Sequence, residues 1–182
     1  MESSGDRDGE TSEDKKPLSS IVVVGASAGG VETLKEFIAT LPDDVPFAIA
    51  IVLHIRADSS SQLPRILNRY GKLKAIHPRS GELIQPGTIY IAPPDHHLVI
   101  REPRLYLTRG PKENNCRPSI DVLFRTAAYS YGPRVIGIVL SGTLDDGTAG
   151  LIAIKEAGGV SIVQNPKEAL WEHPTFVMSI NT

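Results

Sequence analysis

This chain of 182 residues has one cysteine, few aromatic residues and no long hydrophobic run. The single thiol, Cys116, excludes an internal disulfide framework and fits a reducing compartment. No apolar run approaches the roughly 20 residues that a transmembrane helix needs, and the N-terminus has no hydrophobic signal core. We therefore predict a cytoplasmic location and no direct insertion into a membrane.

The chain also has little excess charge of either sign, except at the N-terminus. The formal net charge is −2, and residues 1–17 alone carry −3, so the rest of the chain is close to neutral. This near-neutral remainder of the chain has no excess of basic residues to bind phosphate backbones. Nucleic acid is therefore not a predicted partner. Residues 1–17 have almost no apolar side chains and are predicted to be a disordered acidic leader. Residues 18–182 have room for one domain.

Strand-like and helix-like patterns alternate from residue 18 onward. Residues 19–25 form a short β-branched run that ends in glycine, which is typical of a buried strand. Residues 29–41 then carry apolar side chains at helical spacing and end before a proline. The same two patterns alternate again near the C-terminus. This order predicts an α/β fold with a doubly wound, mostly parallel sheet and helices on both faces.

The middle of the chain follows a different pattern. Residues 87–93, 96–101 and 104–110 are three short strand-like runs. Polar and apolar side chains alternate in the second of them, with His97 among those on the polar side. This alternation predicts an inserted antiparallel β-hairpin with one face in solvent.

Three strand-like runs end in side chains that could perform acyl chemistry together. Ser27 follows the first run, His54 ends the second, and Asp145 and Asp146 follow the run at 134–142. Parallel strands bring their carboxyl ends to one edge of a sheet, where reactive groups collect. We therefore expect the serine, the histidine and one carboxylate to meet there, with Ser27 as nucleophile, His54 as general base and an aspartate orienting the imidazole.

The segment around Ser27 has the form G-x-S-x-G between a strand and a helix, the pattern of a nucleophile elbow. Gly25 and Gly29 are expected to avoid clashes in a tight turn, and the backbone N–H of Ala28 is a candidate donor to an oxyanion. The competing interpretation is a dinucleotide-binding loop. It is disfavoured because Ser27 replaces the second glycine of G-x-G-x-x-G.

The choice of acid stays open at this level. For Asp145, helix capping or solvation is favoured over catalysis, and Asp146 could itself be a helix N-cap. Arg117 and Ser119 begin a predicted helix, where either substrate contact or capping accounts for them. His96 and His97 point to opposite faces of a strand, which is poor geometry for a metal site.

Several stretches together resemble the catalytic domain of the CheB-type chemoreceptor protein-glutamate methylesterase family. They are VVGASAGGVETL, the strand ending in LHI, PGTIYIAPPDHHL, RPSIDVLF and GIVLSGTLDDGTAGLIAIKEAGG, and they extend over most of the chain from Ile21 to Pro174. The resemblance implies the triad Ser27, His54 and Asp146, and a further oxyanion donor in the backbone near Thr143.

The same resemblance implies an activity. It is hydrolysis of γ-glutamyl methyl esters on the methylated cytoplasmic region of chemoreceptors, giving glutamate and methanol, with deamidation of receptor glutamines by the same chemistry. It implies no cofactor and no metal.

Two departures from the family pattern bear on regulation and activity. Residues 1–17 stand where members commonly carry a receiver domain, so a separate response regulator or another regulatory partner is expected to supply control. The chain also ends early, and the C-terminal edge of the domain, within residues 18–182, is expected to be incomplete. The alternative function is therefore a catalytically weak receptor-binding or scaffolding module that keeps the fold.

Overall fold

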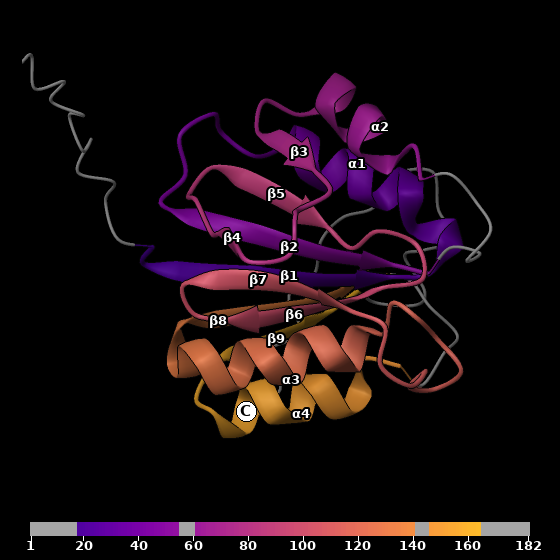
Figure 1. The fold of residues 1–182 in the computed structure, drawn as a ribbon. Coiled ribbons are helices and arrows are strands. Elements are labelled where there is room, and N and C mark those ends of the chain that lie inside the picture. Colours follow the sequence, from indigo (N-terminus) through magenta and orange to yellow (C-terminus); the bar gives the residue numbers. More distant parts are fainter. Residues whose placement is uncertain (1–17, 55–60, 141–145, 165–182) are drawn as a thin grey trace, which may run out of the picture.

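The computed structural model describes residues 18–54, 61–140 and 146–164. The predicted acidic leader and the predicted C-terminal edge lie outside these residues. Two sheets and four α-helices make up the described part (Figure 1). The main-sheet strands are β1 (Ser20–Ala26), β2 (Phe47–Leu53), β3 (Lys74–Ile76), β5 (Thr88–Ile91), β8 (Val135–Leu140) and β9 (Val160–Val163). The helices are α1 (Val31–Ala39), α2 (Leu63–Tyr70), α3 (Ile120–Tyr131) and α4 (Thr148–Glu156).

The main sheet has six strands in the order β3-β5-β2-β1-β8-β9, and every pairing between them is parallel. Its two central strands, β1 and β2, are almost entirely buried because helices cover both faces. This explains why their sequences are continuous apolar runs rather than alternating ones. The predicted doubly wound α/β fold is confirmed.

Successive residues of β1 point to opposite faces and enter two separate cores. Ile21 and Val23 pack with α3, α4 and the smaller sheet. Val22 and Val24 pack with α1 and α2 on the other face. Figure 1 shows the same division, with α1 and α2 on one side of the sheet and α3 and α4 on the other. Because β1 is central, its carboxyl end lies between the two layers.

The antiparallel part is a separate three-stranded sheet in the order β4-β7-β6. The hairpin of β6 (His97–Arg101) and β7 (Arg104–Thr108) agrees with the prediction, and β4 (Glu82–Leu83) joins it with two residues, too short to leave a sequence signal. The run at 87–93 belongs to the main sheet as β5.

One prediction about the hairpin is wrong in detail. The alternating pattern puts His97 on the face toward solvent, yet this residue is 3% exposed. Its Nε2 hydrogen-bonds the carbonyl oxygen of Pro111, and its Nδ1 accepts from the backbone N–H of Ser119. A loop and the start of α3 therefore cover this end of the hairpin and satisfy both ring nitrogens. Within the described ranges, no helix is both long and apolar enough to cross a bilayer.

Candidate active site

Ser27 and His54 leave neighbouring strands side by side. In the parallel register Ala26 pairs with Leu53, so the next residue on each strand is one of these two. The backbone N–H of His54 donates to the carbonyl oxygen of Ala26 at 3.0 Å, which continues the pairing one step beyond the strands. Adjacent strands lie about 4.8 Å apart, so the hydroxyl and the imidazole start from neighbouring backbone positions.

His54 is held by a buried carboxylate. Its Nε2 lies 2.8 Å from Oδ2 of Asp146, a residue 92 positions away in the sequence. The two side chains are 12% and 1% exposed, so little water competes for this bond. A carboxylate accepts, so Nε2 carries a proton, and in the neutral ring Nδ1 keeps its lone pair. Nδ1 is buried and makes no hydrogen bond to any of the described residues. It is therefore the ring atom able to accept a proton.

Asp146 is held in turn by donors from the start of α3. Its oxygens accept from the backbone N–H groups of Ile120 at 2.8 Å and Asp121 at 3.1 Å, and from the hydroxyl of Ser119 at 2.8 Å. The side-chain amide of Asn114 donates a further bond at 3.1 Å. Together these donors hold the carboxylate in a single orientation.

These contacts determine the charge state of Asp146. Burial alone would raise the pKa of its carboxyl, because a buried charge loses its hydration. The hydrogen bonds from His54, from the backbone of Ile120 and Asp121 and from Ser119 outweigh burial and hold the pKa well below its usual range. Asp146 is therefore ionised at neutral pH and presents a negative charge to the His54 ring.

The backbone at Gly147 explains why Asp146 faces α3 rather than its own helix. Gly147 is the N-cap residue of α4 and has a φ of +111°, a conformation that glycine tolerates best. The interpretation of Asp146 as an ordinary N-cap of α4 is therefore wrong. The turn at Gly147 directs its carboxylate to α3 and to His54.

The turn at Ser27 is less strained than the elbow pattern suggests. Ser27 has a φ of −79°, and the short helix Ala28–Gly30 follows it directly. A β-carbon at Gly25 would lie 2.5 Å from the Ile120 side chain, so glycine is required there as expected. A β-carbon at Gly29 would meet nothing within 4 Å among the described residues, so the expected clash at Gly29 is wrong.

Four residues near the pair were not assigned to the site by sequence reasoning. Asn114, Ser119 and Asp121 form the hydrogen-bond network behind Asp146. Cys116 places its sulfur within 4.8 Å of ligand atoms of both His54 and Asp146. Ser119 and Asp121 lie in the RPSIDVLF stretch. Polar residues at the start of a helix were the sequence feature that could have indicated their place in the site. Asn114 and Cys116 lie in a loop with no such pattern.

Arg117 does not offer a free cation to a substrate. Its guanidinium donates to Oδ1 of Asp95 at 2.6 and 2.8 Å and to the carbonyl oxygen of Gly110 at 2.8 Å. The alternative in which Arg117 contacts the substrate therefore loses support. Thr143 and Asp145 lie outside the described residues. Ala28 begins the short helix after Ser27, which is where its backbone was expected.

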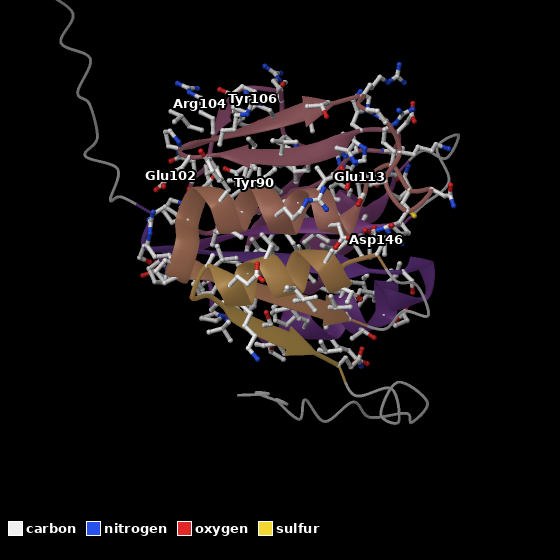
Figure 2. The ribbon with its side chains drawn as sticks, turned by 90° about the horizontal axis from the view of Figure 1, so that it is seen from below. Tyr90, Glu102, Arg104, Tyr106, Glu113 and Asp146 are labelled. Atoms are coloured by element: carbon white, nitrogen blue, oxygen red, sulfur yellow. The ribbon has the colours of Figure 1, made fainter. Side chains whose placement is uncertain are left out.

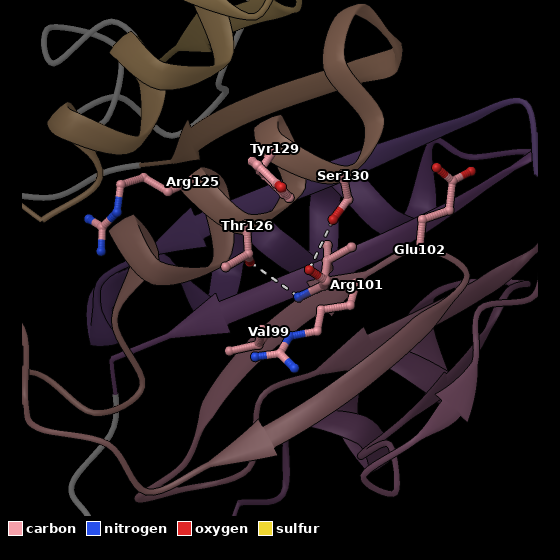
Figure 3. A pocket seen from close by; sticks show the side chains of 8 residues that line it. Val99, Arg101, Glu102, Arg125, Thr126, Tyr129 and Ser130 are labelled. Atoms are coloured by element: carbon pink, nitrogen blue, oxygen red, sulfur yellow. Dashed lines mark hydrogen bonds between the residues drawn. The ribbon is translucent and has the colours of Figure 1, made fainter.

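A surface hollow of about 610 Å³ lies away from this pair. It is set between α3 and β6, and its lining includes Arg101, Glu102 and Tyr129 (Figure 3). Inside it, the hydroxyl of Thr126 accepts from the backbone N–H of Ile100, and Ser130 donates to the carbonyl of the same residue. Figure 2 shows Glu102 at the opposite end of the molecule from Asp146. These two helix hydroxyls satisfy backbone groups of β6, which lies at the edge of the smaller sheet. Among the described residues, the hollow brings no acid–base pair together.

An imidazole on a buried carboxylate, beside a serine at the edge of a parallel sheet, defines a candidate hydrolytic site on an α/β fold. Comparison with known proteins agrees with this class. Residues 22–177 match the family model described as CheB methylesterase. The chain therefore belongs to the CheB methylesterase family, and the expected methylesterase type of enzyme is confirmed.

Individual relatives extend the match. A protein from Leptospira interrogans is 41% identical over 149 residues, which are 81% of this chain and 77% of the relative. A Methanosarcina mazei protein named protein-glutamate methylesterase/protein-glutamine glutaminase 2 is 36% identical over 160 residues, covering 84% of this chain and 44% of its own length. The crystal structure of the Thermotoga maritima CheB methylesterase catalytic domain superposes with a TM-score of 0.78 at 32% identity, over 88% of this chain and 85% of that one.

Proposed function

We propose that this chain is a serine hydrolase that removes methyl groups from γ-glutamyl methyl esters on chemoreceptor-like proteins. The observation that carries the proposal is the 2.8 Å contact between His54 Nε2 and Asp146 Oδ2, next to Ser27 on the neighbouring strand. The names of the relatives indicate the substrate class, and their second activity supports deamidation of glutamine side chains by the same site. The substrate region is cytoplasmic in this proposal, and so is the enzyme.

With these residues the reaction proceeds in two acyl transfers, first to Ser27 and then to water. Ser27 Oγ attacks the ester carbonyl carbon while its proton passes to Nδ1 of His54. The ester C–O bond then breaks, the methoxide oxygen takes that proton, and methanol leaves. Water next gives a proton to Nδ1 and attacks the acyl-serine, which releases glutamate and restores the Ser27 hydroxyl. With a glutamine substrate, ammonia replaces methanol as the leaving group.

Asp146 contributes by its position and its charge. It keeps the proton of the neutral ring on Nε2, so that the lone pair is on Nδ1, and it stabilises the imidazolium that forms in each step. Nδ1 is buried, which shields the proton transfer from bulk water. We propose the backbone N–H of Ala28 and that of Thr143 as donors to the oxyanion that develops on the carbonyl.

Methanol release from a methylated chemoreceptor cytoplasmic fragment tests the proposal. Ser27→Ala is expected to lower the rate by several orders of magnitude because the nucleophile is gone. Ser19→Ala is the matched control, since Ser19 is exposed, lies just before β1 at the other end of that strand and donates to the carbonyl oxygen of Pro46. A folded wild-type chain that binds the fragment but releases no methanol would instead favour the scaffolding function.

A further inference from the structure

The His54–Asp146 pair has a third metal-ligating side chain beside it. The Cys116 sulfur, a His54 ring nitrogen and an Asp146 oxygen all lie within 4.8 Å of one another. These are a soft sulfur, an imidazole nitrogen and a carboxylate oxygen, the three donor types that Zn²⁺ accepts in proteins. Mg²⁺ and Ca²⁺ prefer oxygen ligands alone, so the donor set selects against them.

The loop that carries Cys116 is anchored at this position. Cys116 and Glu113 exchange two backbone hydrogen bonds of 2.8 and 3.2 Å, which close a tight turn. Asn114, inside that turn, donates its amide to both Asp121 and Asp146. The turn is therefore tied to the same carboxylate that holds His54, and the sulfur stays near the pair.

We propose that Zn²⁺ binds between Cys116, His54 and Asp146 and inhibits the enzyme by occupying its imidazole. The inhibitory consequence rests on the proposed function, whereas the binding itself does not. In a tetrahedral Zn²⁺ site with one sulfur ligand, two ligand atoms are about 3.3 to 3.6 Å apart, given bonds of roughly 2.0 to 2.3 Å. The sulfur thus has to approach by up to roughly 1.2 Å, and the 2.8 Å pair has to open by about 0.5 Å. Because the carboxylate of Asp146 is fixed by its other donors, we expect rotations of the Cys116 and His54 side chains to supply this movement.

The proton balance of this step explains the inhibition. Zn²⁺ takes the place of the proton that Nε2 donates to Asp146, and that proton moves to Nδ1. The Cys116 thiol loses its own proton to solvent and binds as thiolate. Nδ1 then holds an N–H and no lone pair, so it cannot accept the proton of Ser27. One Zn²⁺, one thiolate and one carboxylate together carry no net charge, which suits a half-buried site.

The electrostatics of the site support a cation there. Asp146 is a buried carboxylate, 4% exposed, and its negative charge lies near the Cys116 sulfur. The same negative charge that disfavours a bare thiolate attracts a divalent cation, and coordination deprotonates a thiol outright.

Co²⁺ binding tests the metal site without a measurement of esterase activity. Co²⁺ bound to a thiolate absorbs in the near ultraviolet, and Cys116 is the chain's one cysteine, so such a band reports this residue alone. We expect one Co²⁺ per chain in metal-free protein, displacement of the band by Zn²⁺, and its loss in Cys116→Ser. His96→Gln is the matched control, because His96 hydrogen-bonds the carbonyl of Pro94 and is not among the three ligands. A melting curve for each variant checks that it folds.

The inhibition is then measured on methanol release. Zn²⁺ is expected to inhibit the wild type, and Cys116→Ser is expected to need at least tenfold more Zn²⁺ for half-inhibition of its own metal-free rate. Mg²⁺ at the same concentrations should not inhibit.

The two proposals fail in different ways. The cobalt band should persist in Ser27→Ala, which the proposed function makes inactive. A wild-type chain that shows the band but, once metal-free, releases no methanol keeps the metal site and overturns the proposed function. Methanol release by a chain that shows no band, or a band that survives in Cys116→Ser, overturns the metal site alone.

Discussion

Asp121 and Asp146 each accept hydrogen bonds from the start of the other's helix. Asp146, just before α4, accepts the backbone N–H groups of Ile120 and Asp121 at the start of α3. Asp121, in the first turn of α3, accepts those of Gly147 at 3.0 Å and Gly150 at 2.6 Å at the start of α4. This exchange holds the two helix N-termini together and satisfies donors that an isolated helix leaves unpaired. It also directs Asp146 toward His54.

Asp121→Asn is expected to destabilise the fold. The amide nitrogen of asparagine donates rather than accepts, and the substitution removes the negative charge that both helix N-termini favour. We expect the free energy of unfolding in urea to fall by about 1–3 kcal/mol. Glu36→Gln, at an exposed position on α1, is the control and should change it by less than about 0.5 kcal/mol. Equal stability of the two variants would contradict the capping exchange.

Asp146→Asn is expected to affect the rate far more than substrate binding. An asparagine can present its NH₂ group to Nε2, which favours the ring tautomer with the lone pair on the wrong nitrogen. We expect kcat for methanol release to fall by roughly 10⁴-fold with little change in KM. A variant with near-normal kcat would show that Asp146 does not orient His54.

The stability of the same variant should depend on pH in a defined direction. The pKa of Asp146 is lower in the folded chain than its unfolded value of about 4. Its ionised form therefore stabilises the folded state above that pH, and this contribution is lost as the pH falls below it. Urea unfolding from pH 7 to pH 3 should show the gap between wild type and Asp146→Asn narrowing toward low pH. A constant gap contradicts the lowered pKa.

Gly25→Ala and Gly29→Ala separate the two glycines of the serine motif. A methyl group at Gly25 has to displace Ile120, which is 3% exposed and whose N–H donates to Asp146. We expect a loss of about 1–3 kcal/mol in stability and a lower kcat. Gly29→Ala should leave the free energy of unfolding within about 0.5 kcal/mol. Strong destabilisation by Gly29→Ala would mean that residues outside the described part crowd that position.

Asn114→Gly tests the amide that joins the two aspartates. Its backbone has a φ of +51°, which glycine adopts without strain, so the substitution removes the side chain alone. Loss of two hydrogen bonds to charged groups is expected to lower kcat about tenfold while KM stays the same. Asn115→Gly is matched to it, because Asn115 is the next residue, is exposed and has a φ of +61°. Asn115→Gly should behave as wild type, and equal effects of the two would assign the loss to the turn.

Much of the architecture followed from local patterns in the sequence. Continuous apolar runs and helical spacing predicted the parallel sheet and its helices, because a strand covered on both faces and a helix covered on one have different periodicities. The two-residue strand β4 and the assignment of β5 to the main sheet did not follow, since pairing partners are not encoded in a short run. The burial of His97 could not be predicted because a distant loop and helix, rather than its own strand, determine it.

The sequence alone placed Ser27, His54 and Asp146 at the ends of three strand-like runs, because a parallel sheet collects such ends at one edge. The tertiary structure decided which atoms meet: Nε2 with Oδ2, the donors of α3 behind the carboxylate, and the Cys116 sulfur beside the pair. Those contacts join loops and helices that are far apart in the chain. Their geometry depends on how both layers pack on the sheet, which no local pattern of residues records.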